Sequence, residues 1–336
     1  MAGTLFERAV EVNRRLVGEQ HPEFATNLNN LAALYITIGR YREAEPLLKQ
    51  VVQLRRRIYG ENSTSLAQSL NNLAALYNST GQYQKAEKIY NHALDAWRTV
   101  EGKDDLDVAQ CLSNLAELYH ATGRDVEAMS MVKRSFATCR LVNNGDNHLF
   151  GEILDLLSRI CRQIGHLDEA IAMSEQSVEI HRRSLGNNHP TFAASIMNLA
   201  LLHQMTGDFA SAESLFVDAL EIFRKSLGED HPKFATALNC LGAIFIATER
   251  YEEAETLLKQ ASTILLIKFG PRDVDFAQSL EYLAELYEVT GRISEAGRLF
   301  HLALKIASAT LAPEDPMVQT FRRNLNLFVQ KRRGQA

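Results

Sequence analysis

The feature that most constrains the fold of this 336-residue chain is an internal repeat of 42 residues. The string NNLAALY occupies residues 29–35 and returns at residues 71–77, and related strings begin in the same register at residues 113, 197, 239 and 281. Self-similarity at a fixed period of this size indicates stacked structural units. We therefore expect seven repeats, with a half-repeat helix before them in residues 1–17 and a capping helix with a basic tail after them in residues 312–336. The expected repeats are 18–59, 60–101, 102–143, 144–185, 186–227, 228–269 and 270–311.

Three kinds of residue recur at fixed positions of the register. The core leucine is Leu31, Leu73, Leu115, Leu157, Leu199, Leu241, Leu283 and Leu325. The second half of each repeat carries a small residue, which is Ala44, Ala86, Ala128, Ala170, Ala212, Ala254 and Ala296. A glycine separates the two halves in six repeats, and Glu249 replaces it in the other. The sequence shows no linker, so we expect one continuous array.

Each repeat has the pattern of two helices. In the first repeat, Phe24, Leu28 and Leu31 recur at steps of three and four residues, which is typical of an amphipathic helix. The segment after Gly39 shows the same spacing from Ala44 onward, and glycine favours the left-handed conformation that ends a helix. No segment alternates as a strand would, so the sequence predicts an all-α fold of stacked antiparallel helix pairs.

Composition and missing motifs narrow the classes of function that this chain can have. The chain has 36 basic and 41 acidic residues, which gives no net attraction to nucleic acid or to an anionic membrane. Its four cysteines form no CxxC pair, and no apolar run approaches the roughly 18 residues of a membrane span. Motifs for a phosphate-binding loop, a nucleophile elbow, a dinucleotide-binding turn and a zinc peptidase are all missing. We expect a cytoplasmic protein without catalytic residues, metal ligands or cofactor.

The repeat resembles the tetratricopeptide repeat. The order Asn30-Leu31-Ala32, Tyr35, Gly39 and then a tyrosine and a small alanine matches that family, although its common period is 34 residues. The longer period, the LNNLAALY string and the HP-containing segments between repeats resemble the kinesin light chain subfamily. This resemblance implies a right-handed α-solenoid whose first helices line a concave groove. It also implies that asparagines of the NNLA motif bind cargo peptides there.

Polar residues beside the core leucine on each first helix are the candidate groove residues. An amide side chain both donates and accepts hydrogen bonds, which suits an extended peptide backbone. Leu156, Cys240 and Tyr282 interrupt the asparagine series. Arg159 and Arg162 could pair with a ligand carboxylate. Arg159 could equally pair with Asp155, four residues earlier on the same helix. The candidate residues are Asn29, Asn30, Gln68, Asn71, Asn72, Gln110, Asn114, Arg159, Arg162, Asn198 and Asn239.

Two alternatives stay open at this stage. The asparagines could bind a partner, or they could join neighbouring helices and maintain the repeat geometry. At the level of function, the sequence favours a non-enzymatic scaffold that binds a peptide or protein segment. The alternative is a regulatory or sensor arm of a larger multidomain enzyme or signalling ATPase, linked to a protease or nucleotide-binding module.

Overall fold

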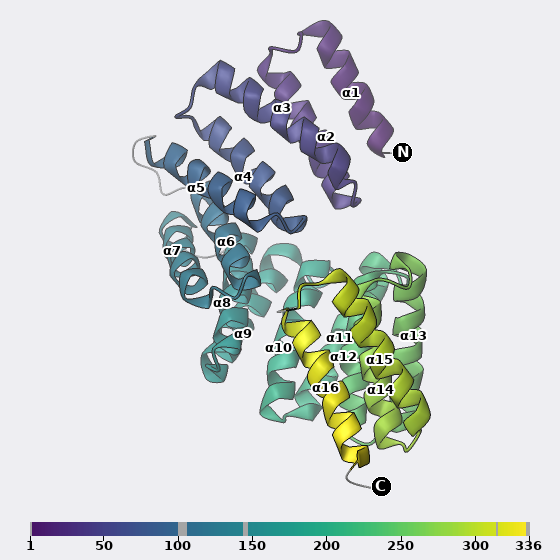
Figure 1. Cartoon of the computed structure of the whole chain (residues 1–336). Helices are drawn as coiled ribbons and strands as arrows, with labels where there is room; N and C mark the ends of the chain where they lie inside the picture. Colours follow the sequence, from purple (N-terminus) through teal and green to yellow (C-terminus); the bar gives the residue numbers. More distant parts are fainter. Residues whose placement is uncertain (1, 100–105, 144–146, 314, 334–336) are drawn as a thin grey trace. The chain divides into compact units, whose positions relative to one another are not determined.

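The computed structural model describes residues 2–99, 106–143, 147–313 and 315–333, and every regular element in them is an α-helix. This confirms the predicted all-α class (Figure 1). The first eight helices are α1 (Ala2–Leu16), α2 (Pro22–Thr37), α3 (Tyr41–Tyr59), α4 (Thr64–Ser79), α5 (Tyr83–Thr99), α6 (Leu106–Ala121), α7 (Asp125–Asn143) and α8 (His148–Gln163). The next eight are α9 (Leu167–Leu185), α10 (Pro190–Thr206), α11 (Phe209–Leu227), α12 (Pro232–Ala247), α13 (Tyr251–Phe269), α14 (Val274–Val289), α15 (Ile293–Thr310) and α16 (Pro316–Arg333).

The chain divides into two compact units, residues 1–165 and residues 166–336. The division falls inside the segment 144–185 that the register marks as one repeat. The predicted boundaries at residues 101/102 and 143/144, and the last residues of the basic tail, involve positions outside the described part of the chain.

Within each unit, neighbouring helices pack in two alternating ways. A first helix packs on the second helix of its own repeat, as α4 does on α5 and α12 on α13. That second helix then packs on the first helix of the next repeat, as α5 does on α6 and α13 on α14. First helices also contact one another, including α4 with α6 and α12 with α14. Side chains on successive first helices can therefore meet.

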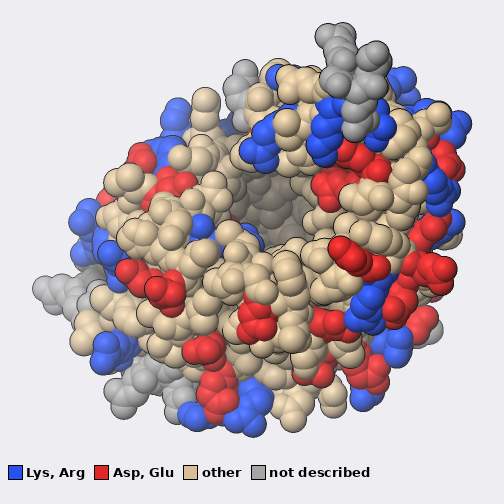
Figure 2. Space-filling model, turned by 90° about the horizontal axis from the view of Figure 1, so that it is seen from below, with Lys and Arg blue, Asp and Glu red and all other residues tan. Residues whose placement is uncertain are grey.

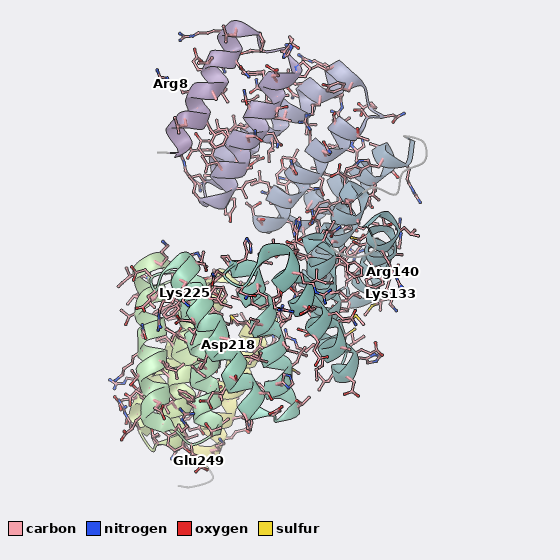
Figure 3. All side chains as sticks on the ribbon, turned by 180° about the vertical axis from the view of Figure 1, so that it is seen from behind. Arg8, Lys133, Arg140, Asp218, Lys225 and Glu249 are labelled. Atoms are coloured by element: carbon pink, nitrogen blue, oxygen red, sulfur yellow. The ribbon has the colours of Figure 1, made fainter. Side chains whose placement is uncertain are left out.

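Local sequence fixes where the helices begin and end. The imidazole Nδ1 atoms of His21, His189 and His231 each accept a backbone N–H two residues later, at 3.3, 3.2 and 3.1 Å, and so cap α2, α10 and α12. Each histidine precedes a proline, which suits the first turn of a helix. The turn between α12 and α13 contains Glu249 at a φ of 60°, where other repeats have glycine (Figure 3).

The recurring residues form the core. All eight leucines of the register are at most 9% exposed, and all seven alanines are 0% exposed. Burying one leucine contributes about 1.5–3 kcal/mol, and a small residue at a helix crossing lets the two backbones approach. The strictest positions of the repeat are therefore the positions at which the helices pack most closely.

A polar contact between repeats recurs on several second helices. Tyr119 donates its hydroxyl to Glu87 at 3.0 Å, and Arg124 pairs with Glu87 at 2.9 Å while its guanidinium lies 4.1 Å from the Tyr119 ring centroid. Tyr287 and Arg292 make the same contacts with one glutamate on α13. These contacts join the end of a first helix to the preceding repeat.

Candidate binding surface on the first helices

Asparagines of successive first helices bond to one another. The Nδ2 atom of Asn72 on α4 donates to Oδ1 of Asn29 on α2 at 2.9 Å. Asn114 on α6 makes the same bond to Asn71 on α4 at 3.1 Å. Each bond spans 43 residues, so it links the same two positions of adjacent repeats. The asparagines therefore join neighbouring helices, which is one of the two roles left open by the sequence.

These bonds leave the asparagine amides with unused hydrogen-bond donors and acceptors. A side-chain amide has two N–H donors and a carbonyl oxygen with two lone pairs, so one bond does not exhaust it. Asn29, Asn71, Asn72 and Asn114 are each half-buried, and Asn30 is exposed. Binding of a partner by these five residues stays a prediction.

Two glutamines extend the polar layer. Gln110 donates from Nε2 to Oδ1 of Asn114 at 3.0 Å on the same helix. Gln68 on α4 donates from Nε2 to a carboxylate oxygen of Asp107 on α6. Three separate sets of hydrogen-bonded amide and carboxylate groups therefore join α2, α4 and α6.

These amide side chains border a pocket of about 290 Å³. Five of its lining residues are predicted groove residues, which the fold brings together from α2, α4 and α6. The remaining three are Arg55 on α3, Trp97 on α5 and Asp107 on α6. The lining residues are Asn29, Arg55, Gln68, Asn71, Asn72, Trp97, Asp107 and Gln110.

Arg55 brings a positive charge to this pocket. Its Nη1 donates to the backbone carbonyl of Ser65 at 2.9 Å and to Oγ of Ser69 at 3.1 Å. Arg55 makes no ion pair with any described carboxylate, and burial lowers the pKa of its guanidinium. An arginine stays protonated at neutral pH even so. The half-buried cation therefore retains donors for an anionic group.

The side chain of Trp97 also lines this pocket, although its indole nitrogen is itself buried. Its side chain is 6% exposed, and its indole Nε1–H has no hydrogen-bond partner among the described residues. A buried tryptophan N–H usually finds an acceptor, and leaving one without a partner costs about 1–3 kcal/mol. A ligand acceptor that reached this N–H would recover that free energy.

Neither Arg55 nor Trp97 is among the groove residues that the sequence predicts. The register contained the signal. The same position of the later repeats carries residues that are at most 1% exposed, namely Cys139, His181, Phe223, Leu265 and Ala307. An arginine and a tryptophan at a core position of two adjacent repeats depart from that pattern.

The family follows from the repeats themselves. A model described as "Tetratricopeptide repeat" matches residues 1–57, 65–141 and 191–266, and a second model of the same description matches residues 152–191. This chain belongs to the tetratricopeptide repeat family. No curated protein matches it significantly.

Several solved structures resemble this chain in fold. The apo form of the quorum sensor NprR from B. thuringiensis has a TM-score of 0.71 and 16% identity, with 90% of this chain and 82% of NprR covered. A Rap protein complexed with Competence and Sporulation Factor gives 0.56 and 14%, with 94% and 99% covered. BtubC (BKLC) from P. vanneervenii gives 0.56 and 21%, with 69% and 94% covered. At these identities the likeness shows the tetratricopeptide fold alone.

The predicted residues on α8 and α10 are not among those that line the pocket. Arg159 on α8 pairs with Glu117 on α6 at 3.3 Å. The predicted exposed pair of Arg159 with Asp155 is wrong, because Asp155 is only 6% exposed. Arg162 on α8 and Asn198 on α10 are half-buried. Their part in binding stays a prediction.

The structure corrects the prediction that Asn239 lines a groove. It is 4% exposed on α12, and its Nδ2 donates to Oγ of Ser279 on α14 at 2.7 Å. A bound peptide cannot reach a side chain that is buried between α12 and α14. The amide at this position serves packing within residues 166–336.

The acidic residues of α14 are also more buried than a solvated face would be. Glu281 is 1% exposed and accepts a hydrogen bond from Asn324 of α16 at 2.9 Å. Burial raises the pKa of Glu281 to about 8 and that of Glu285 to about 7. Glu281 is therefore a buried hydrogen-bonding group and not part of a solvated face.

Charge over the wider surface is mixed. Lys and Arg side chains lie among Asp and Glu side chains on the face shown in Figure 2. Within the described residues, none of the helices combines the length and apolar character needed to cross a bilayer. Local groups such as Arg55, rather than a broad field of one sign, distinguish the candidate surface.

Proposed function

We propose that this protein is a non-enzymatic scaffold that binds a peptide or protein segment on the first helices of residues 1–165. The observation that carries the proposal is the polar pocket, where a row of amides lies beside the Arg55 guanidinium and beside Trp97, whose indole N–H has no acceptor among the described residues. The amides of Asn29, Asn71 and Asn72 suit the N–H and C=O groups of an extended backbone. Several such bonds are needed, because each contributes only about 0.5–1.5 kcal/mol.

The pocket favours a segment that presents a carboxylate. Arg55 offers a charged donor, and Trp97 offers a neutral one, so both suit an anionic acceptor. A hydrogen bond to a charged group contributes about 1.5–3 kcal/mol. Asp107, the carboxylate among the lining residues, is held by Gln68 and would accept a donor from the ligand. A segment with an acidic side chain next to a polar or basic one could therefore bind Arg55 through its carboxylate and donate a hydrogen bond to Asp107.

The family supports this proposal. One structural neighbour was solved in complex with Competence and Sporulation Factor, and another is described as a quorum sensor. Both descriptions concern those proteins, and the pocket is what extends a binding role to this chain. A regulatory role toward a separate catalytic module stays a prediction from the sequence.

A peptide-display selection on the intact chain tests the proposal. We expect the enriched peptides to contain Asp or Glu. The tightest peptide should bind Arg55→Leu at least tenfold more weakly, as judged by fluorescence anisotropy. Leucine is a suitable replacement because Leu265 fills the same register position with no exposed surface.

The matched control is Arg57→Leu, because Arg57 lies on the same helix, carries the same charge and is exposed. It should leave the affinity within twofold of the unmodified chain. The proposal fails if the selection enriches no peptide, or if the enriched peptide binds Arg55→Leu as well as it binds the unmodified chain. An equal loss in both variants would reduce the effect to net charge and would also contradict it.

A further inference from the structure

Apolar side chains gather on the surface of the last turn of α13. Leu266 is 40% exposed, Ile267 is 80% exposed and Phe269 is 48% exposed. Ile264, one turn before Ile267, is half-buried against the core of its own unit. Single exposed apolar residues are normal on a protein surface, whereas a larger contiguous group marks an interaction surface. We call these four residues the α13 patch.

The α13 patch takes the place of a charged surface. The equivalent positions of α11 hold a glutamate and two cations that pair with it at 3.0 and 3.2 Å, namely Glu221, Arg224 and Lys225, the last of which is labelled in Figure 3. The same set on α9 is Glu179, Arg182 and Arg183, with ion pairs of 2.7 and 2.6 Å. The residues of α13 at these positions are Thr263, Leu266 and Ile267. Because cations near the end of a helix are favourable, α13 lacks a stabilising feature of its neighbours and carries an apolar surface instead.

A pocket of about 640 Å³ adjoins the α13 patch. Ile264 and Ile267 line this pocket from α13, and Glu229 and Asp230 line it from the turn between α11 and α12. The pocket can therefore receive an apolar side chain against the two isoleucines, with charged groups beside it.

Two of the charged residues that line this pocket have no ionic partner among the described residues. Glu229 and Lys259 are neutralised within the chain by ion pairs of 2.8 and 2.7 Å. Asp230 and Lys268 also line the pocket, are exposed and make no ion pair with a described residue. The surface therefore offers one unpaired charge of each sign beside an apolar centre.

We propose that the α13 patch is the contact surface between two copies of this chain. A symmetric dimer uses the same surface twice, so that surface must be complementary to itself. An apolar centre with one unpaired charge of each sign meets this condition. Ile267 of each copy enters the pocket of the other, and Asp230 of each copy pairs with Lys268 of the other. A partner with charges of one sign would instead place a like charge opposite Asp230 or Lys268.

Sedimentation equilibrium of the intact chain tests this proposal independently of the polar pocket, which lies in residues 1–165. An interface centred on a few apolar residues is small, so we expect a monomer–dimer equilibrium with a dissociation constant on the order of 10 µM. Ile267→Arg should raise that constant at least tenfold. Its melting temperature by circular dichroism should match that of the unmodified chain, because Arg183 occupies the equivalent position of α9.

The matched control is Val126→Arg on α7, because Val126 is 85% exposed and lies in the other unit. It should leave the dimer dissociation constant within twofold of that of the unmodified chain. The proposal is overturned if the chain stays monomeric at concentrations on the order of 100 µM. A dimer that Ile267→Arg leaves unchanged, or that Val126→Arg weakens equally, would also overturn it.

Exchange of the two unpaired charges tests the pairing itself. Asp230→Lys and Lys268→Glu should each weaken self-association at least fivefold, because each variant sets like charges against each other. A cation is tolerated at the position of Asp230, since Arg272 occupies it in the next repeat. A mixture of the two single variants should form a dimer with one copy of each, and the double variant should recover the original affinity to within threefold. If neither recovers self-association, the proposed pairing is wrong.

Discussion

At the scale of single residues, the candidate site is made by departures from the repeat. Leucine, alanine and glycine recur because each repeat needs the same helix crossing and the same turn. They predicted the fold for that reason. Arg55 and Trp97 occupy a position that is apolar or fully buried in the later repeats, so agreement among repeats could not reveal them. Comparing the residues at each repeat position and noting those that differ from the rest would have identified both Arg55 and Trp97.

Glu249 provides a test of the turn chemistry. It adopts a φ of 60°, where six other repeats carry glycine at the corresponding position. A left-handed conformation costs an ordinary residue about 1–2 kcal/mol, and the greater freedom of unfolded glycine offsets part of that. We expect Glu249→Gly to raise the free energy of unfolding by up to about 1 kcal/mol in urea denaturation. Gly207→Ala at the equivalent turn should lower it, and a fall in Glu249→Gly would contradict the account.

Glu281 predicts a pH dependence of stability. Burial raises its folded-state pKa to about 8 from an ordinary value of 4.5, so the folded state favours the neutral form. The associated stabilisation is complete below pH 4.5 and is lost as the pH rises toward 8. Glu281→Gln keeps a neutral acceptor for Asn324 at every pH. We expect it to exceed the unmodified chain in unfolding free energy by roughly 4 kcal/mol at pH 8, and by only about 1 kcal/mol at pH 5.

Urea denaturation at the two pH values measures this difference. Glu288→Gln is the control, because Glu288 pairs with Lys331 at 2.8 Å and lies nearer to solvent. It should be no more stable than the unmodified chain at pH 8. A Glu281→Gln variant that gained the same free energy at pH 5 and pH 8 would show that its carboxyl group does not titrate in this range.

At the scale of helices, α9 differs from α13, which is also a second helix. Its buried residues are Ala170, Ser174, Ser177 and His181, whereas α13 buries Ala254, Leu258, Ala261 and Leu265 at the same positions. His181 Nδ1 lies 2.7 Å from Oγ of Ser195 and 3.3 Å from Oγ of Ser177. Hydrogen bonds replace apolar contacts along this helix.

Ser174 is the weak point of that arrangement. Its hydroxyl is 0% exposed and has no hydrogen-bond partner among the described residues. Removing a buried hydroxyl without a partner recovers its desolvation cost, so we expect Ser174→Ala to raise the unfolding free energy by about 1 kcal/mol. Amide hydrogen exchange across α9 should slow in the variant. Faster exchange there would show that the hydroxyl has a stabilising partner.

The asparagines mark the limit of sequence reasoning at this scale. Spacing placed them correctly on the first helices of residues 1–165, and the fold gathers several around one pocket. Spacing could not decide whether an amide faces a ligand or the next helix, because both lie on the same side of a first helix. Asn239 shows the difference, since its amide is buried against Ser279.

At the scale of the whole molecule, the two units have different first-helix faces. Residues 1–165 contain the amide bonds and the pocket, whereas residues 166–336 bury Asn239 and Glu281. In the sequence, Leu156, Cys240 and Tyr282 interrupt the asparagine series, and two of these three interruptions lie in residues 166–336. Recognition is therefore expected to centre on one unit rather than on a uniform groove along every repeat.

The most direct test of that claim is the indole N–H resonance of Trp97, which is the single tryptophan of the chain. A nitrogen–hydrogen correlation spectrum of the labelled protein should show one indole signal. On addition of a selected acidic peptide, that signal should move downfield as the N–H gains an acceptor, and it should stay in place for Arg55→Leu at the same peptide concentration. An indole signal that does not move while the peptide is shown to bind would place the ligand elsewhere and contradict the account.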